Sequence, residues 1–135
     1  MSLTVQEVKS ELQKLDSMWD LHLNKFCEPE GYAHSLVQRW GKEGLKPTQL
    51  RKVFNQLKAR KREVEKERDK EFNREKILPL LPMLAYACGR DLIPKDFYDI
   101  MKICLGQEKL KTNKDFVRLV EFVEAILAFH KFEFK

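Results

Sequence analysis

The sequence predicts an all-α fold, a compact helical bundle of about five to six helices in a single domain spanning residues 1–135. Apolar residues recur at intervals of three and four along almost the whole chain, which is the period of an α-helix. No stretch alternates between apolar and polar residues as a half-buried strand would. The length of 135 residues suits one domain with its own hydrophobic core.

The first apolar stripe predicts one long helix over residues 4–24. Thr4 and Glu7 have the spacing of a capping box, in which each side chain accepts a hydrogen bond from the other residue's backbone. The segment 27–31, with the sequence CEPEG, then breaks the helical pattern. A short helix over about 33–42 is expected to follow.

The third predicted helix begins near Thr48, because Pro47 suits the first position of a helix. Its buried face is expected to consist of Leu50, Val53, Phe54 and Leu57. The segment 58–71, KARKREVEKERDKE, is highly charged and consists mostly of good helix formers. We therefore expect it to continue the helix as an exposed arm.

Two prolines disturb the next apolar segment. Because of Pro79 and Pro82, a helix should start near Pro82, or a longer one should kink there. Gly89 is placed to be the left-handed residue that ends this helix. A further helix is predicted over about 94–105.

The last helix is predicted to be the central one. Thr112 and Asp115 have the spacing of a second capping box. Apolar residues then lie almost all round the helix, as in a helix surrounded by others. His130 lies on its apolar stripe, so we expect it to be packed or to interact with the helix dipole.

The positive charge is concentrated in one segment. Lys and Arg number 26 and Asp and Glu number 21, a formal net charge of +5. Residues 51–76 hold eleven of these bases and six of the acids, an excess equal to that of the whole chain. Six bases without an acid begin the segment: Arg51, Lys52, Lys58, Arg60, Lys61 and Arg62. Clustered charge of this kind is typical of proteins that bind a polyanion.

A helical wheel divides this charge between two edges. One edge carries Arg51, Lys58, Arg62 and Lys66, and the other carries Glu63, Glu67 and Glu71. The basic edge could follow consecutive phosphates of a nucleic acid. The alternative is an exposed helix held by pairs such as Arg62–Glu65 and Glu67–Lys70. The pattern alone leaves both interpretations open.

The sequence gives little sign of catalysis, cofactors or metal. Cys27, Cys88 and Cys104 are scattered, which favours neither a disulfide framework nor a zinc site. No glycines have the spacing of a phosphate-binding loop. We expect no cofactor and no metal. Trp40, Tyr32 and Tyr86 could stack on bases, but on apolar helix faces we expect them in the core.

The location is expected to be cytoplasmic. No stretch reaches the ~18 apolar residues of a membrane-spanning helix. The N-terminus also lacks the basic start and apolar run of a signal peptide.

Three segments of the sequence are distinctive: TQLRKVFNQLK at 48–58, LPMLAYACGR at 81–90 and FVEAILAFHKF at 122–132. Together, in this order and spacing, they resemble the small-subunit family of the type III-A CRISPR effector, the Csm complex. The resemblance covers about residues 45–132, and the middle segment is the most specific. Cys88 stands where a small residue such as alanine would be expected.

This resemblance implies an all-helical, non-catalytic subunit that assists antiviral defence. Its members line up in several copies beside guide RNA paired with target RNA, and they contact the backbone without reading the sequence. The implied partners are guide RNA, target RNA, other Csm subunits and further copies arranged head to tail. A homodimer of the isolated chain is also conceivable.

The resemblance and the charge pattern each indicate RNA-binding residues. Arg51, Lys52 and Arg90 stand at matched motif positions, and the charge pattern adds the other four bases of segment 51–62. Arg90 could instead neutralise its helix end or pair with Asp91.

Two other functions remain open. One is a helical adaptor that holds protein neighbours and barely contacts RNA. The other is a metal-independent ribonuclease that uses His22 or His34.

Overall fold

The computed structural model describes residues 3–134, which form seven α-helices and two short 3-10 helices. The α-helices are α1 (Val5–Lys14), α2 (Leu23–Phe26), α3 (Tyr32–Gly44), α4 (Pro47–Val64), α5 (Leu80–Gly89), α6 (Lys95–Cys104) and α7 (Asn113–Glu133). The 3-10 helices are η1 (Met18–Asp20) and η2 (Arg74–Lys76). No strand forms within this range, so the all-α prediction is confirmed; residues 1, 2 and 135 lie outside it.

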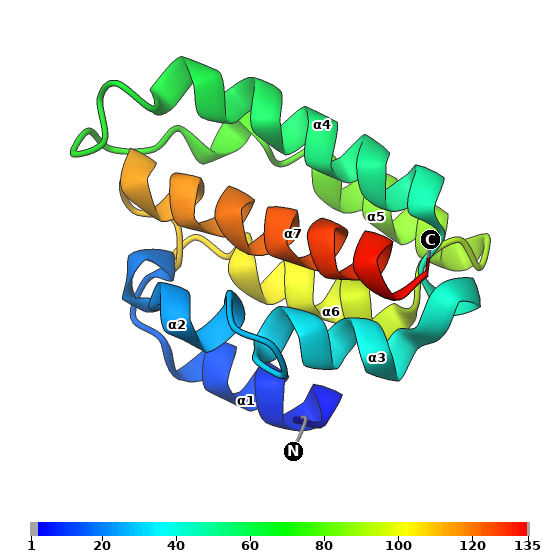
Figure 1. Cartoon of the computed structure of the whole chain (residues 1–135). Coiled ribbons are helices and arrows are strands. Elements are labelled where there is room, and N and C mark those ends of the chain that lie inside the picture. Colours follow the sequence, from blue (N-terminus) through cyan, green and yellow to red (C-terminus); the bar gives the residue numbers. More distant parts are fainter. Residues whose placement is uncertain (1–2, 135) are drawn as a thin grey trace.

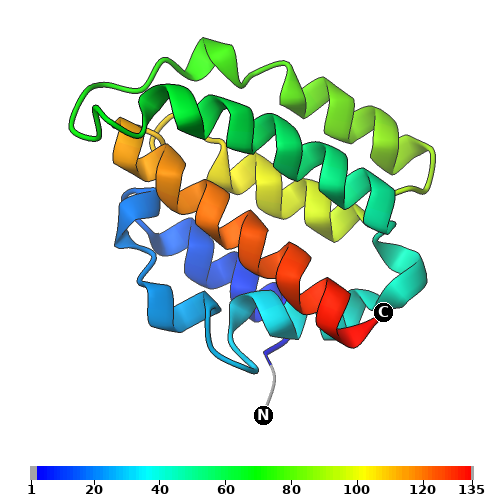
Figure 2. The same cartoon turned by 45° about the horizontal axis from the view of Figure 1, so that its top comes forward.

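The helices pack in two layers of three. In one layer α7 lies between α3 and α4, and in the other α6 lies between α1 and α5. Figure 1 shows α7 running through the middle of the bundle with α4 above it and α3 below. Figure 2, turned by 45°, shows the same order, with α5 beside α4 at the top.

The core surrounds α7, as the sequence predicted. Phe116, Phe122 and Ile126 of this helix are fully buried and belong to one hydrophobic cluster with residues of all the other α-helices. Thr112 and Asp115 form the predicted capping box. Cys104 is fully buried in the same cluster, and burial raises the pKa of its thiol to about 12.

The prediction of one helix over residues 4–24 is wrong. The capping box of Thr4 and Glu7 begins α1, but α1 ends at Lys14. Leu15 and Ser17 are extended, and the chain re-forms only the short helices η1 and α2. Helical spacing of apolar residues therefore continues across a break in the helix.

A buried lysine explains the break. The Nζ of Lys109 donates hydrogen bonds to the carbonyl oxygens of Gln13, at 3.1 Å, and of Leu15. The Lys109 carbonyl accepts from the backbone N–H of Met18 at 2.9 Å. The segment after α6 thus satisfies the backbone groups that a longer helix would have paired internally.

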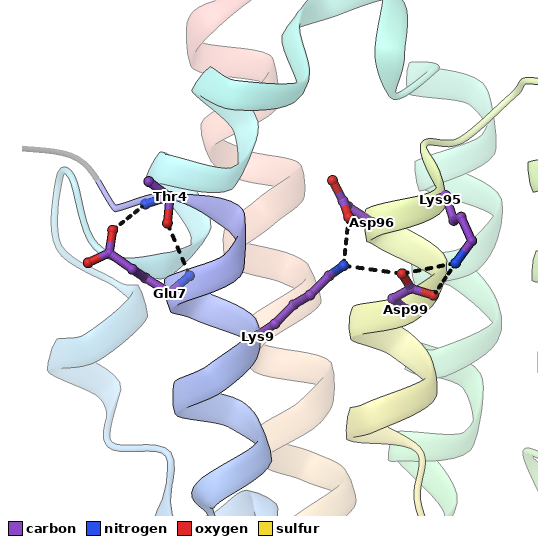
Figure 3. A network of polar contacts seen from close by, with 6 residues as sticks. All are labelled: Thr4, Glu7, Lys9, Lys95, Asp96 and Asp99. Carbon is purple, nitrogen blue, oxygen red and sulfur yellow. Dashed lines mark hydrogen bonds and ion pairs between the residues drawn. The ribbon is translucent and has the colours of Figure 1, made fainter.

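A second lysine joins α1 to α6 (Figure 3). The Nζ of Lys9 lies 2.6 Å from Oδ1 of Asp96 and 3.1 Å from Oδ2 of Asp99. The hydrogen bond to Asp96 is the main reason that the pKa of Lys9 is raised. Partial burial alone would raise the pKa of Asp99, but hydrogen bonds from Lys9 and Lys95 hold it below its usual range.

Two turns also differ from prediction. The helix predicted over about 33–42 continues to Gly44, because Gly41, with φ +72°, kinks α3 and the chain makes one more turn through residues 42–44. After α5 the left-handed residue is Asp91, with φ +62°, and not Gly89, which belongs to the helix. α5 begins at Leu80, so Pro82 falls in its first turn, where a missing N–H costs little.

Candidate nucleic-acid interface

Helix α4 presents one buried face and one exposed face. Pro47 occupies its first turn, as predicted. Leu50, Val53, Phe54 and Leu57 are all buried, and the helix packs against α7. The bases of the segment 51–62 must therefore lie on the flanks or on the outer face of the helix.

Four of these bases are exposed and have no carboxylate partner within residues 3–134. They are Arg51, Lys52, Lys58 and Arg62, and we call them the free basic edge. Arg51, Lys58 and Arg62 share one flank of the helix, and Lys52 lies about 100° round from Arg51, on the outer face. Among residues 3–134, Lys58 alone of the four lies over an aromatic ring, with its Nζ 5.8 Å from the centre of the Phe54 ring. The predicted pair between Arg62 and Glu65 does not form.

The other two bases are partly neutralised. Arg60 lies 3.2 Å from Glu63, and Lys61 lies 3.8 Å from Glu65. Glu63 is also 3.9 Å from Lys76, on the flank of α4 that faces the start of α5. Part of the basic run is therefore paired with carboxylates, and part of it is not.

The predicted helical arm over 58–71 is wrong in its second half. α4 ends at Val64, and Glu67 then pairs with Lys70, as predicted, but within a turn. The chain returns to the bundle, where the ring of Phe72 stacks on that of Phe116 at 4.6 Å. Lys66 and the acids after Glu65 therefore do not continue the edges drawn on the helical wheel.

Arg90 lies at the end of α5. Its guanidinium donates a hydrogen bond of 3.0 Å to the hydroxyl of Tyr86 and lies 5.7 Å from that ring, and no ion pair joins it to Asp91. The backbone N–H of Lys46 donates to the carbonyl of Leu92 at 3.2 Å, which places this turn beside the start of α4. Tyr86, expected in the core, is 65% exposed.

Two further bases near Arg51 were not predicted. Lys42, after the Gly41 kink, and Lys131, near the end of α7, line the same pocket as Arg51. No spacing in the sequence signals this arrangement, because it arises from three helices that converge.

The histidines do not form an acid–base pair in the described structure. Nδ1 of His34 accepts a hydrogen bond from the N–H of Glu30 at 2.9 Å, so Nε2 carries the proton and donates to Glu133 at 2.6 Å. This hydrogen bond lowers the pKa of Glu133. No contact joins His34 to the exposed His22 in residues 3–134, so the ribonuclease alternative gains no support.

Between residues 3 and 134, no group of three His, Cys, Asp or Glu side chains has an arrangement that could hold a metal ion. Over that same range no helix combines the length and the apolar character needed to cross a membrane.

The family model for Csm2 Type III-A matches residues 24–135. No curated protein and no solved structure gives a match. The matched range contains α3 to α7, the free basic edge and Arg90, and it extends the resemblance seen in the sequence at both ends. The chain therefore belongs to the Csm2 family of small subunits of the type III-A CRISPR Csm complex.

Proposed function

We propose that this chain binds the backbone of guide RNA paired with target RNA through the free basic edge of α4, without catalysing a reaction. The observation that carries the proposal is that Arg51, Lys52, Lys58 and Arg62 are exposed on one helix and unpaired among residues 3–134. An unpaired cation can neutralise a phosphate without first losing a carboxylate partner. Arg60 and Lys61 would have to exchange their partners, so they contribute less.

The length of the edge fits several phosphates. Residues 51–62 rise about 16 Å along the helix at 1.5 Å per residue. Arg90 adds a cation beside the start of α4, where its contact with Tyr86 holds it. The side chains would contact phosphates rather than base edges, so binding would be independent of sequence. Such a subunit would act in the cytoplasm together with the other subunits of the Csm complex.

Charge reversal tests the proposal. The double variant Lys52→Glu, Arg62→Glu should bind a guide–target duplex much more weakly, and the loss should be the same for every duplex sequence. Since each lost phosphate contact removes about one unit of salt slope, log Kd against log salt should flatten by about two. Fluorescence anisotropy at several salt concentrations measures both quantities.

The control variant carries the same change of charge elsewhere. Lys25 on α2 and Lys102 on α6 are exposed and have no carboxylate partner in the described chain. The variant Lys25→Glu, Lys102→Glu should keep most of the affinity and slope. Equal losses in the two variants would show that the affinity depends only on the net charge of the chain. Unchanged binding in the first variant would refute the proposal.

A second candidate function, an adaptor between proteins, is favoured by exposed apolar side chains. Phe132 is 66% exposed and borders an apolar pocket of about 530 Å³. Its other lining residues are Pro29, His34, Ala128 and Phe129. Surfaces of this kind often mark contacts between proteins, and here the contact could join copies head to tail.

Sedimentation separates the two functions. The unmodified chain should self-associate at high concentration, and it should do so more strongly when a long duplex is present. Phe132→Ser should weaken this self-association. The variant should leave the affinity of a single copy for a short duplex unchanged. If the chain is only an adaptor, Lys52→Glu, Arg62→Glu should assemble normally. A monomer at every concentration, with and without RNA, would contradict self-association.

A further inference from the structure

A small pocket opens where the end of α3, the start of α4 and the end of α7 meet. Its volume is about 260 Å³. Three cations line it, Lys42, Arg51 and Lys131, one from each helix. This pocket adjoins the free basic edge through Arg51, but its other lining residues take no part in the backbone contact proposed above.

The charge around this pocket is of one sign. Lys42, Arg51 and Lys131 are all exposed, and none forms an ion pair within residues 3–134. No acidic residue lines the pocket. Three cations held near one another repel, so an anion bound among them would relieve that repulsion.

The remaining lining is apolar apart from one histidine. Pro47, Leu127 and Phe134 supply the apolar surface. The rings of Phe134 and His130 meet edge to face with centres 5.1 Å apart. A simple anion would not contact the apolar lining. A ligand that joins an anionic group to a flat ring would contact both the cations and the apolar lining.

His130 offers a hydrogen-bond acceptor to this pocket. Its Nε2 lies 2.9 Å from the carbonyl oxygen of Leu45, so Nε2 carries the proton. Nδ1 then presents a lone pair, and no hydrogen bond to it forms among residues 3–134. Burial lowers the pKa of His130, which keeps the ring neutral near pH 7.

We propose that this pocket binds a single ribonucleotide unit, with its phosphate among Lys42, Arg51 and Lys131. The base lies against Leu127 and Phe134, and a hydroxyl or amino group of the nucleotide donates to Nδ1 of His130. The volume is close to the lower end of ligand pockets, ~300 Å³, which suits a ligand of this size.

The source of the nucleotide is either an RNA strand or a free mononucleotide, since both present the same groups. The inference that an RNA strand supplies it rests on the proposed function, because Arg51 belongs to both surfaces. A base that leaves the strand beside the free basic edge would then enter the pocket. Binding of a free mononucleotide does not depend on that function.

Three small ligands test the pocket on the full chain: adenosine 5′-monophosphate, ribose 5-phosphate and inorganic phosphate. NMR titration should map all three to the ends of α3 and α7, with affinity falling in that order. Phe134→Ala should weaken binding of the mononucleotide about tenfold, as expected for loss of one base–aromatic contact. It should leave the affinity for phosphate unchanged, whereas Lys131→Gln should weaken all three ligands.

Matched controls exclude general effects. Phe132→Ala removes a neighbouring aromatic ring that does not line the pocket, and Lys25→Gln removes an exposed cation elsewhere, so neither should change any of the three affinities. If Phe134→Ala fails to fold, Lys131→Gln, which changes an exposed side chain, still provides the test. Equal affinities for the mononucleotide and phosphate, or spectral shifts elsewhere on the molecule, would overturn the inference.

The two sources are separated with RNA. If a strand supplies the nucleotide, a duplex with one unpaired nucleotide should bind more tightly than a fully paired one, and Phe134→Ala should abolish that preference. Mononucleotide binding without such a preference would assign the pocket to free nucleotides. Lys52→Glu, Arg62→Glu should weaken duplex binding but leave mononucleotide binding intact, so failure of the proposed function and failure of this inference give different results.

Discussion

At the scale of residues, two buried cationic side chains form hydrogen bonds to the backbone of an irregular segment. Lys109 is 4% exposed and donates to two carbonyl oxygens beyond the end of α1. Arg118 of α7 is also buried, donates to the carbonyls of Trp19 and Leu21, and lies 4.1 Å from the Trp19 ring. These contacts fasten the irregular segment after α1 to the core of the bundle.

Replacing Lys109 should therefore reduce stability more than replacing an exposed neighbour. Lys109→Met keeps the length of the side chain but leaves the carbonyls of Gln13 and Leu15 without their donor. We expect the free energy of unfolding in urea to fall by about 2 kcal/mol, as for loss of hydrogen bonds to a charged group.

Lys111 provides the comparison for this experiment. It is exposed, and its side chain donates one hydrogen bond, of 3.0 Å, to the carbonyl of Asp16. Lys111→Met should cost about 0.5 kcal/mol or less, as is usual for exposed positions. Similar losses in the two variants would show that burial of Lys109 adds nothing to stability.

The sequence could predict which residues are basic, but not which of them are paired. Arg62 and Lys61 are neighbours in one run, yet only Lys61 reaches Glu65. Spacings of three and four residues both suit an ion pair on a helix, so the sequence alone does not decide between Arg62 and Lys61. Whether the unpaired residues bind RNA stays a prediction.

At the scale of elements, prediction succeeded where a helix begins at a signal in the local sequence. The capping boxes of α1 and α7 and the proline in the first turn of α4 depend on neighbouring residues, and all three were found. Prediction failed where a distant segment ends the helix. The break after Lys14 depends on Lys109, nearly a hundred residues away along the chain.

The end of α4 has a similar cause. Good helix formers continue past Val64, yet the N–H groups of Phe72, Asn113 and Lys114 form hydrogen bonds that join this segment to the start of α7. Each bond, to Lys111, Lys70 and Arg68 respectively, is 2.9–3.0 Å long. Tertiary contacts here outweigh helix propensity, which contributes only a few tenths of a kcal/mol per residue.

At the scale of the whole molecule, stability should fall when the pH drops below 6.5, the ordinary pKa of histidine. Burial holds the pKa of His130 below that value in the folded chain, so the unfolded chain takes up the proton first. The stabilisation is fully present above pH 6.5 and is lost progressively as the pH falls through the lowered pKa.

The variant His130→Gln isolates this effect, because glutamine can still donate to the carbonyl of Leu45. Urea unfolding at pH 7.5 and pH 5.5 should show a smaller loss of stability in the variant than in the unmodified chain. His34 and the carboxylates are present in both proteins and cancel in the comparison. An identical loss in both would show that His130 does not contribute.

The central position of α7 has a consequence for synthesis of the chain. Both α3 and α4 bury their apolar faces against a helix that the ribosome makes after them. Until residues 113–133 have emerged from the exit tunnel, those faces have no native cover, and the nascent chain must remain incompletely folded. Chaperones that shield apolar segments would therefore be most needed during translation, and folding should finish in one late step.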